Sequence, residues 1–175
     1  MTLYKDKYRI ESTRLKDWDY SRDGYYFVTI CTQDKKCFFG DVIDEKVPLS
    51  AIGEMVADEW QKTPQIRKNV SLDAWIIMPN HLHGIVVINN DGGNASVCRG
   101  GQGKMKSGSL GAVIGQFKTQ CKKRTIAAGH NFSWQTRFYD HIIRNEKTLK
   151  KIREYIINNP LKWEIDKEIP ANLFM

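Results

Sequence analysis

Two histidines one residue apart are the part of this sequence best suited to chemistry. They stand in the segment PNHLH at positions 79–83, directly after a turn signal and directly before the apolar run GIVVI. Side chains two residues apart on a β-strand point to the same side, so His81 and His83 are expected to project together. Such a pair could hold one divalent ion, although a third ligand must then come from elsewhere. The alternative, which we favour less for a pair than for a single histidine, is that both rings only hydrogen-bond neighbouring groups.

Two rival metal sites are excluded by the residues around this pair, and a third by the cysteines. A histidine-triad nucleotide hydrolase would carry a further histidine two positions on, where the chain has Ile85, and no HExxH segment is present. The cysteines form no CxxC pair, so a zinc ribbon is not supported. They are Cys31, Cys37, Cys98 and Cys121. We expect free thiols in a reducing cytoplasm.

A second candidate group lies near the C-terminus, in KIREYIINNP. Ile152 and Ile156 fall at helical spacing and are expected to pack inward, with Tyr155 beside them. Asn159 follows Tyr155 by four residues and Lys151 precedes it by four, so all three share one side of a helix. Taken alone, this pattern is equally that of an ordinary amphipathic helix end.

The elements that must position these groups can be predicted from periodicity and turn signals. Aromatic and β-branched runs predict strands over 25–32, 70–78 and 81–88, the last two joined as a β-hairpin by the PN turn, and a further strand over 138–143. On the strand 70–78, alternation predicts one shared face, made of Val70, Leu72, Ala74 and Ile76. Helices are predicted over 51–63 after the cap Ser50, over 110–129, and over 145–159, with Asn145 as its cap and Pro160 directly after it.

Length and charge bound the class of protein. The 175 residues favour one domain, and the net charge of +7 favours an anionic partner, most commonly nucleic acid. No segment approaches the ~20 apolar residues of a spanning helix, and the charged N-terminus lacks the apolar core of a signal peptide. We therefore expect a cytoplasmic, nucleoid-associated protein without membrane contact. Its expected parts besides the strands and helices are an irregular N-terminal arm (1–22), a flexible loop (89–109) and a C-terminal tail (161–175).

Three segments, in order, resemble the HUH superfamily of single-tyrosine transposases, and most closely the REP-associated tyrosine transposases. They are MPNHLHGIV (78–86), SLGAVIGQFK (109–118) and FYDHIIRNEKTLKKIREYIINNPLKW (138–163), the last with the Tyr-Ile-x-x-Asn-Pro element of that group. The resemblance covers residues 20–165. It implies an α+β fold: a ferredoxin-like antiparallel sheet with helices packed on one face and the HUH pair on a central strand.

The resemblance also implies a chemistry. His81, His83 and Asn159 would be metal ligands for Mg²⁺ or Mn²⁺, and Tyr155 the nucleophile. The activity would be cleavage and rejoining of single-stranded DNA through a 5′-phosphotyrosine intermediate. The expected substrates are hairpin or palindromic elements. Two alternatives stay open at this point: a nucleic-acid-binding module without catalysis, and a rolling-circle replication initiator or relaxase.

Basic and aromatic side chains are the candidates for holding the DNA. The basic candidates are Lys104, Lys106, Lys118, Lys122, Lys123, Arg124, Arg137, Arg144 and Lys151. Trp134, Phe138 and Tyr139 could stack on unpaired bases, although core packing is expected for at least one of them. A homodimer, and a tyrosine acting in cis or in trans, are left open. His130 has no predicted role, and for His141 we expect a structural hydrogen bond.

Overall fold

The computed structural model describes residues 3–4, 7–8, 15, 17–90 and 106–163. Most of the predicted arm, loop and tail lies outside these residues, as does Lys104, so those predictions stay untested. The strands are β1 (Leu3–Tyr4), β2 (Lys7–Tyr8), β3 (Gly24–Cys31), β4 (Val70–Met78), β5 (His81–Ile88) and β6 (Tyr139–Ile143). The helices are η1 (Gln33–Lys35), α1 (Ala51–Gln61), α2 (Thr63–Ile66), α3 (Leu110–Ala127), α4 (Glu146–Ile157) and η2 (Pro160–Lys162).

Four strands form one antiparallel sheet in the order β4-β5-β3-β6, while β1 and β2 pair separately. The chain order β3-α1-β4-β5-α3-β6 is that of a split βαβ, ferredoxin-like unit. The two inner strands are β5 and β3. The predicted strands and the predicted β-hairpin are therefore confirmed to within a residue at each end.

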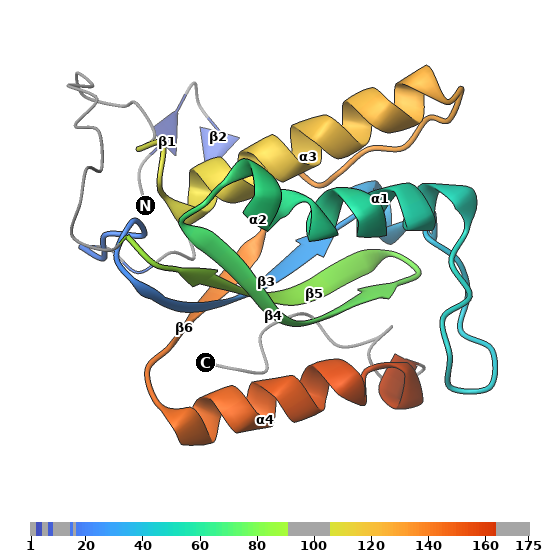
Figure 1. Cartoon of the computed structure of the whole chain (residues 1–175). Helices are drawn as coiled ribbons and strands as arrows, with labels where there is room; N and C mark the ends of the chain where they lie inside the picture. Colours follow the sequence, from blue (N-terminus) through green and yellow to red (C-terminus); the bar gives the residue numbers. More distant parts are fainter. Residues whose placement is uncertain (1–2, 5–6, 9–14, 16, 91–105, 164–175) are drawn as a thin grey trace.

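Helices cover both faces of this sheet, so the prediction of helices on one face is wrong for α4. Figure 1 shows α1 and α3 on one side of the sheet and α4 on the other. Each side has its own apolar cluster, one reaching α1 and α3 and the other built on Leu149, Ile152 and Ile156 of α4. The physical reason is that β5 is buried at every position, and a strand that is apolar on both faces needs a cover on each.

Helix starts follow the predicted caps. The Ser50 hydroxyl accepts a hydrogen bond from the Gly53 amide (3.1 Å) at the start of α1. The Asn145 side chain accepts one from the Thr148 amide (2.8 Å) at the start of α4. At the other end of α4, Asn159 keeps helical backbone angles (φ −61°, ψ −40°) although a proline follows. The residue before it, Asn158, leaves helical geometry (φ −89°, ψ 7°), so α4 ends at Ile157, two residues short of the predicted end.

Strand β4 departs from simple alternation. Its register against β5 shifts between Leu72 and Trp75, the mark of a β-bulge, which adds one residue and reverses the sides of those that follow. Val70 and Leu72 consequently pack in the cluster under α1 and α3, whereas Ala74 and Ile76 pack in the one under α4. The prediction that these four share a face is wrong for that reason.

Candidate active site

Strand β5 presents both histidines toward α4. Ile85, two residues beyond His83, packs in the cluster built on α4, whereas Leu82 and Val86 pack in the cluster on the opposite face. Because alternate residues of a strand share a face, His81 and His83 lie on the side that α4 covers. The sheet thus brings the pair to the one helix that carries the tyrosine.

The two rings point their outermost nitrogens at each other. The Nε2 atoms of His81 and His83 are 3.0 Å apart, and each Nδ1 contacts an oxygen, Oδ1 of Asn80 at 2.7 Å and Oγ1 of Thr29 at 2.9 Å. The Asn80 amide nitrogen donates to the Lys35 carbonyl (3.1 Å), so its Oδ1 faces His81 as an acceptor. His81 must then carry its proton on Nδ1, which leaves a lone pair on Nε2.

Both imidazoles are neutral at physiological pH. The pKa of His81 is lowered to about 4, mainly by burial and also by the charge of Lys35, while a hydrogen bond with Asn159 opposes these effects. Burial also places the pKa of His83 well below its ordinary value, and His81 beside it acts in the same direction. Neutral imidazole is the form that binds metal ions, so the pair is in the state that a metal site requires.

Tyr155 of α4 lies directly beside this pair. Its hydroxyl is 3.4 Å from Nε2 of His83, and its ring meets the His83 ring edge-on, with centroids 5.2 Å apart. Phe27 packs against both, stacked on His83 and edge-on to Tyr155. The phenol oxygen and the imidazole nitrogens therefore converge within one chain.

Asn159 completes the group. It is fully buried, and its side chain hydrogen-bonds to His81. Trp163, which we did not predict, stacks on His81 with ring centroids 6.0 Å apart; an aromatic residue shortly after the helix was the only signal for it. Among the described residues no group of three or more His, Cys, Asp and Glu side chains could hold a metal ion. The candidate ligand set is two imidazoles and one amide.

An ion pair that sequence reasoning missed ties α4 to the sheet. Nε and Nη2 of Arg153 contact the two carboxylate oxygens of Asp73 at 2.9 and 2.6 Å, and Asp73 also accepts from the Ala74 amide (2.6 Å). Asp73 lies at the bulge of β4, and Arg153 is two residues before Tyr155. No local pattern links these two positions, so only the folded chain reveals the contact.

Several of the predicted DNA-binding cations are engaged within the fold. The Lys118 ammonium donates to the carbonyls of Gln135 (2.7 Å) and Arg137 (3.0 Å), and burial lowers its pKa to about 8. Lys122 donates to the Phe132 carbonyl and to Asn131. These two lysines therefore hold the segment after α3.

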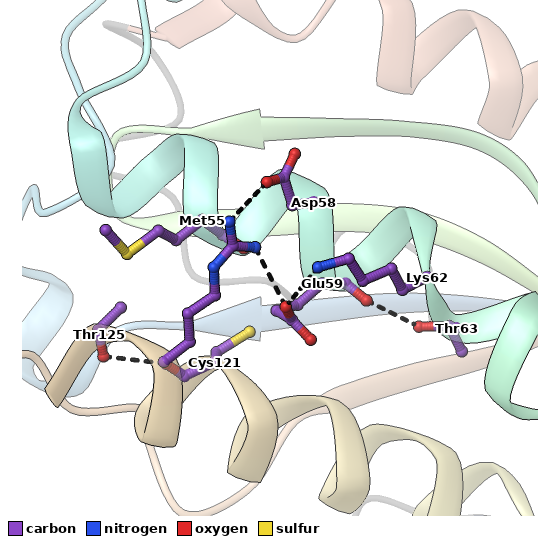
Figure 2. A network of polar contacts seen from close by, with 8 residues as sticks. Met55, Asp58, Glu59, Lys62, Thr63, Cys121 and Thr125 are labelled. Atoms are coloured by element: carbon purple, nitrogen blue, oxygen red, sulfur yellow. Dashed lines mark hydrogen bonds and ion pairs between the residues drawn. The ribbon is translucent and has the colours of Figure 1, made fainter. Parts of the chain in front are cut away.

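Arg124 is likewise held by α1. Its guanidinium pairs with Asp58 (2.8 Å) and Glu59 (3.1 Å), both of which Figure 2 shows. Lys106 forms an ion pair with Asp19 (2.6 Å). For these two residues a DNA contact would have to compete with a carboxylate partner.

The other candidates are distributed over the surface and the core. Lys123, Arg137 and Lys151 are exposed, and Arg144 is exposed over the Trp18 ring. Trp134 packs among Phe39, Phe117 and Phe132, as a core residue does. Phe138 is partly buried against the same cluster.

Two more of the predicted residues lie on β6. Tyr139 is partly exposed and pairs in register with Thr29, and His141 pairs with Phe27. Because cross-strand partners share a face, both lie on the side of the sheet that carries the histidine pair. The DNA contacts themselves stay predictions.

Comparison with known proteins finds relatives over most of the chain. No family model matches the chain. An uncharacterized protein of Haemophilus influenzae is 37% identical over 163 residues, which are 89% of this chain and 91% of that protein. A second protein of that organism, named as a candidate REP-associated tyrosine transposase, is 26% identical over 89% of this chain and 82% of its own length.

The chain is thus similar over most of its length to a protein that carries the name REP-associated tyrosine transposase. Its fold is that of a solved REP-associated tyrosine transposase bound to a REP hairpin, with a TM-score of 0.58 and 22% identity over 86% of this chain and 74% of that one. The predicted resemblance to this group is confirmed by the relatives that carry its name. No helix in the described part of the chain is long and apolar enough to cross a membrane.

Proposed function

We propose that this chain cleaves and rejoins single-stranded DNA that carries hairpins, as a transposase with Tyr155 as its nucleophile. The observation that carries the proposal is the 3.4 Å separation between the Tyr155 hydroxyl and Nε2 of His83, which itself lies 3.0 Å from Nε2 of His81. A phosphoryl-transfer site needs a nucleophile beside groups that can bind a cation, such as the divalent ion that two neutral imidazoles could hold. A solved relative is bound to a REP hairpin, which supports this substrate class.

The reaction balances without an energy-rich cofactor. The Tyr155 oxygen forms a bond to phosphorus and loses its proton to solvent. The bond between phosphorus and the 3′ oxygen breaks, and that oxygen takes a proton from solvent. The products are a 5′-phosphotyrosine and a free 3′-OH. Since one phosphodiester replaces another, a 3′-OH can reverse the step and join the strands.

The residues present fit a divalent ion. Two ligand nitrogens at right angles around an ion with ~2.1 Å bonds are about 3 Å apart, and the Nε2 atoms are 3.0 Å apart. The oxygen partners of both Nδ1 atoms orient the rings, as the outer contacts of metal-bound histidines do. His81, His83 and the Asn159 amide would hold the ion, which we expect to be Mg²⁺ or Mn²⁺. When bound, it would neutralise phosphate charge.

The test is a cleavage assay with a labelled single-stranded DNA hairpin and Mn²⁺. The native chain should become covalently attached to the new 5′ end that the cut creates. The Tyr155→Phe variant should bind the DNA without becoming attached, and His83→Ala should lose most of the attachment. Excess chelator should abolish it. An adduct formed by Tyr155→Phe would refute the nucleophile, and a native chain that shifts DNA without acquiring it would indicate a binding module.

A further inference from the structure

The turn after β3 is tied to the histidine strand. The Thr32 amide donates to the Asn80 carbonyl (2.9 Å), and the Asn80 side chain donates to the Lys35 carbonyl (3.1 Å). The same Asn80 side chain contacts Nδ1 of His81 at 2.7 Å. A single amide therefore links the backbone of Lys35 to the ring of His81, so the turn and the site have a fixed relation.

The backbone of this turn is held in an uncommon conformation. Asp34 and Lys35 are consecutive non-glycine residues in the left-handed region, with φ of 56° and 53°. Such residues persist where surrounding contacts hold them. Here Thr32 supplies those contacts: its carbonyl accepts from the Lys35 amide (3.3 Å) and its hydroxyl donates to the Lys36 carbonyl (2.7 Å). The backbone of the turn at Lys35 is thus held by these contacts.

The Asn80 contacts place the turn that carries Lys35 beside His81. The charge of Lys35 lowers the pKa of His81, and it also counteracts the burial that raises the pKa of the Cys31 thiol. Cys31 and His81 are cross-strand partners at this end of the sheet. The turn follows Cys31 directly, so the strand pairing brings it to the end of the sheet where His81 lies, and the two pKa effects agree with that position.

Lys35 also differs from the cations that the fold uses internally. Lys35 is exposed, and no hydrogen bond or ion pair within the described ranges occupies its ammonium. In contrast, Lys118, Lys122 and Arg124 each contact an oxygen of the fold. A free ammonium beside the proposed reaction centre is suited to an anion. In a bound DNA strand, the anions nearest to the phosphate under attack are the adjacent backbone phosphates.

We propose that Lys35 binds a backbone phosphate of the DNA strand next to the phosphate that Tyr155 attacks. This inference rests on the proposed function. The turn would act as a rigid clamp: Asn80 connects it to His81, so that holding the neighbouring phosphate also sets the distance between the reacting phosphate and the histidine pair.

The test compares Lys35→Gln with the matched control Lys36→Gln, which removes the same charge one residue away. All variants carry Tyr155→Phe for binding measurements, so that no DNA is cleaved. Lys35→Gln should weaken binding of the hairpin strand roughly three- to fivefold and reduce the slope of log affinity against log salt by about 0.7. Lys36→Gln should change neither, and Lys35→Arg should retain both.

The phosphate is then located with neutral methylphosphonates placed singly around the cleavage position. One substitution should weaken binding by the Lys35 protein and have no further effect on Lys35→Gln. If every methylphosphonate affects both proteins equally, or if Lys35→Gln and Lys36→Gln behave alike, the Lys35 contact is refuted. A failure of the native chain to bind or cut the strand at all would instead refute the proposed function.

Discussion

At the scale of single residues, Thr29 is the group on which the orientation of His83 depends. Its hydroxyl is the oxygen partner of His83 Nδ1 at 2.9 Å, in a buried position on the neighbouring strand. Thr29→Val keeps the β-branched shape and removes that partner. We expect cleavage to fall by about 10- to 100-fold, the usual cost of removing an outer contact of a metal-binding histidine.

The measurement that separates positioning from general damage is the Mn²⁺ concentration for half-maximal cleavage. It should rise in Thr29→Val and stay near the native value in Thr29→Ser, which retains a hydroxyl. Thr119→Val, at an exposed threonine that hydrogen-bonds only within α3, serves as the matched control. A Thr29→Val protein with native metal dependence would show that Thr29 does not act through His83.

Gly84, between His83 and Ile85 on β5, is required by close packing on the opposite face. A Cβ there would lie 2.6 Å from a ring carbon of Trp60, and Trp60 is fully buried. Gly84→Ala should lower the free energy of unfolding by about 1–3 kcal/mol, as overpacking of a core does.

The control is Gly115→Ala on α3, where a Cβ meets nothing within 4 Å. It should raise the free energy of unfolding by about 0.5–1 kcal/mol, because alanine is the better helix former. Urea denaturation monitored by circular dichroism measures both values. Equal stability of the two variants would contradict the packing argument.

At the scale of elements, the ion pair between Asp73 and Arg153 fixes α4 on the sheet. Arg153→Gln removes this ion pair, two residues before Tyr155. The cleavage rate should fall about tenfold or more, because a small misplacement of a reacting group has a large kinetic effect. DNA binding should change much less than the rate. The control is Glu146→Gln, which affects only the longer contact of Arg153 (3.6 Å) with an exposed carboxylate.

The same pair predicts a pH dependence of stability. Hydrogen bonds from Arg153 lower the pKa of Asp73, with a smaller contribution from the Ala74 amide. A lowered pKa in the folded state gives stability that is present above the unfolded value of about 4 and lost as pH falls below it. The native chain should therefore be more stable than Asp73→Asn from pH 5 to 7, and thermal unfolding should show that difference shrinking below pH 4. A stability difference between the two proteins that does not change with pH would show that the ion pair is not its cause.

At the scale of the whole molecule, the site is complete within one chain. Tyr155 and His83 meet in the same subunit, which favours a tyrosine acting in cis. A mixture of Tyr155→Phe and His83→Ala should then form no more covalent adduct than the two variants do separately. Restored attachment in the mixture would show that subunits exchange their α4 helices, and a sizing column run on the same sample would show whether they pair.

Local periodicity was enough to determine much of this protein. The alternation at His81 and His83, the helical spacing of Tyr155 and Asn159, and the cap at Asn145 all involve residues within a few positions of each other. Backbone geometry alone relates such residues, so their common faces could be predicted without knowing the fold. Three segments in the same order along the chain gave the resemblance to the REP-associated tyrosine transposases.

Only the tertiary structure decided how these local pieces meet. Asp73 and Arg153 are 80 positions apart in the chain, and the bulge that places Asp73 beside α4 leaves no periodic signal. Contacts between distant segments likewise decide which lysines donate hydrogen bonds to backbone carbonyls. They also decide which face of the sheet α4 covers. Burial of both faces of β5 demands a second cover, and α4 supplies it with Tyr155 on the side of the histidines.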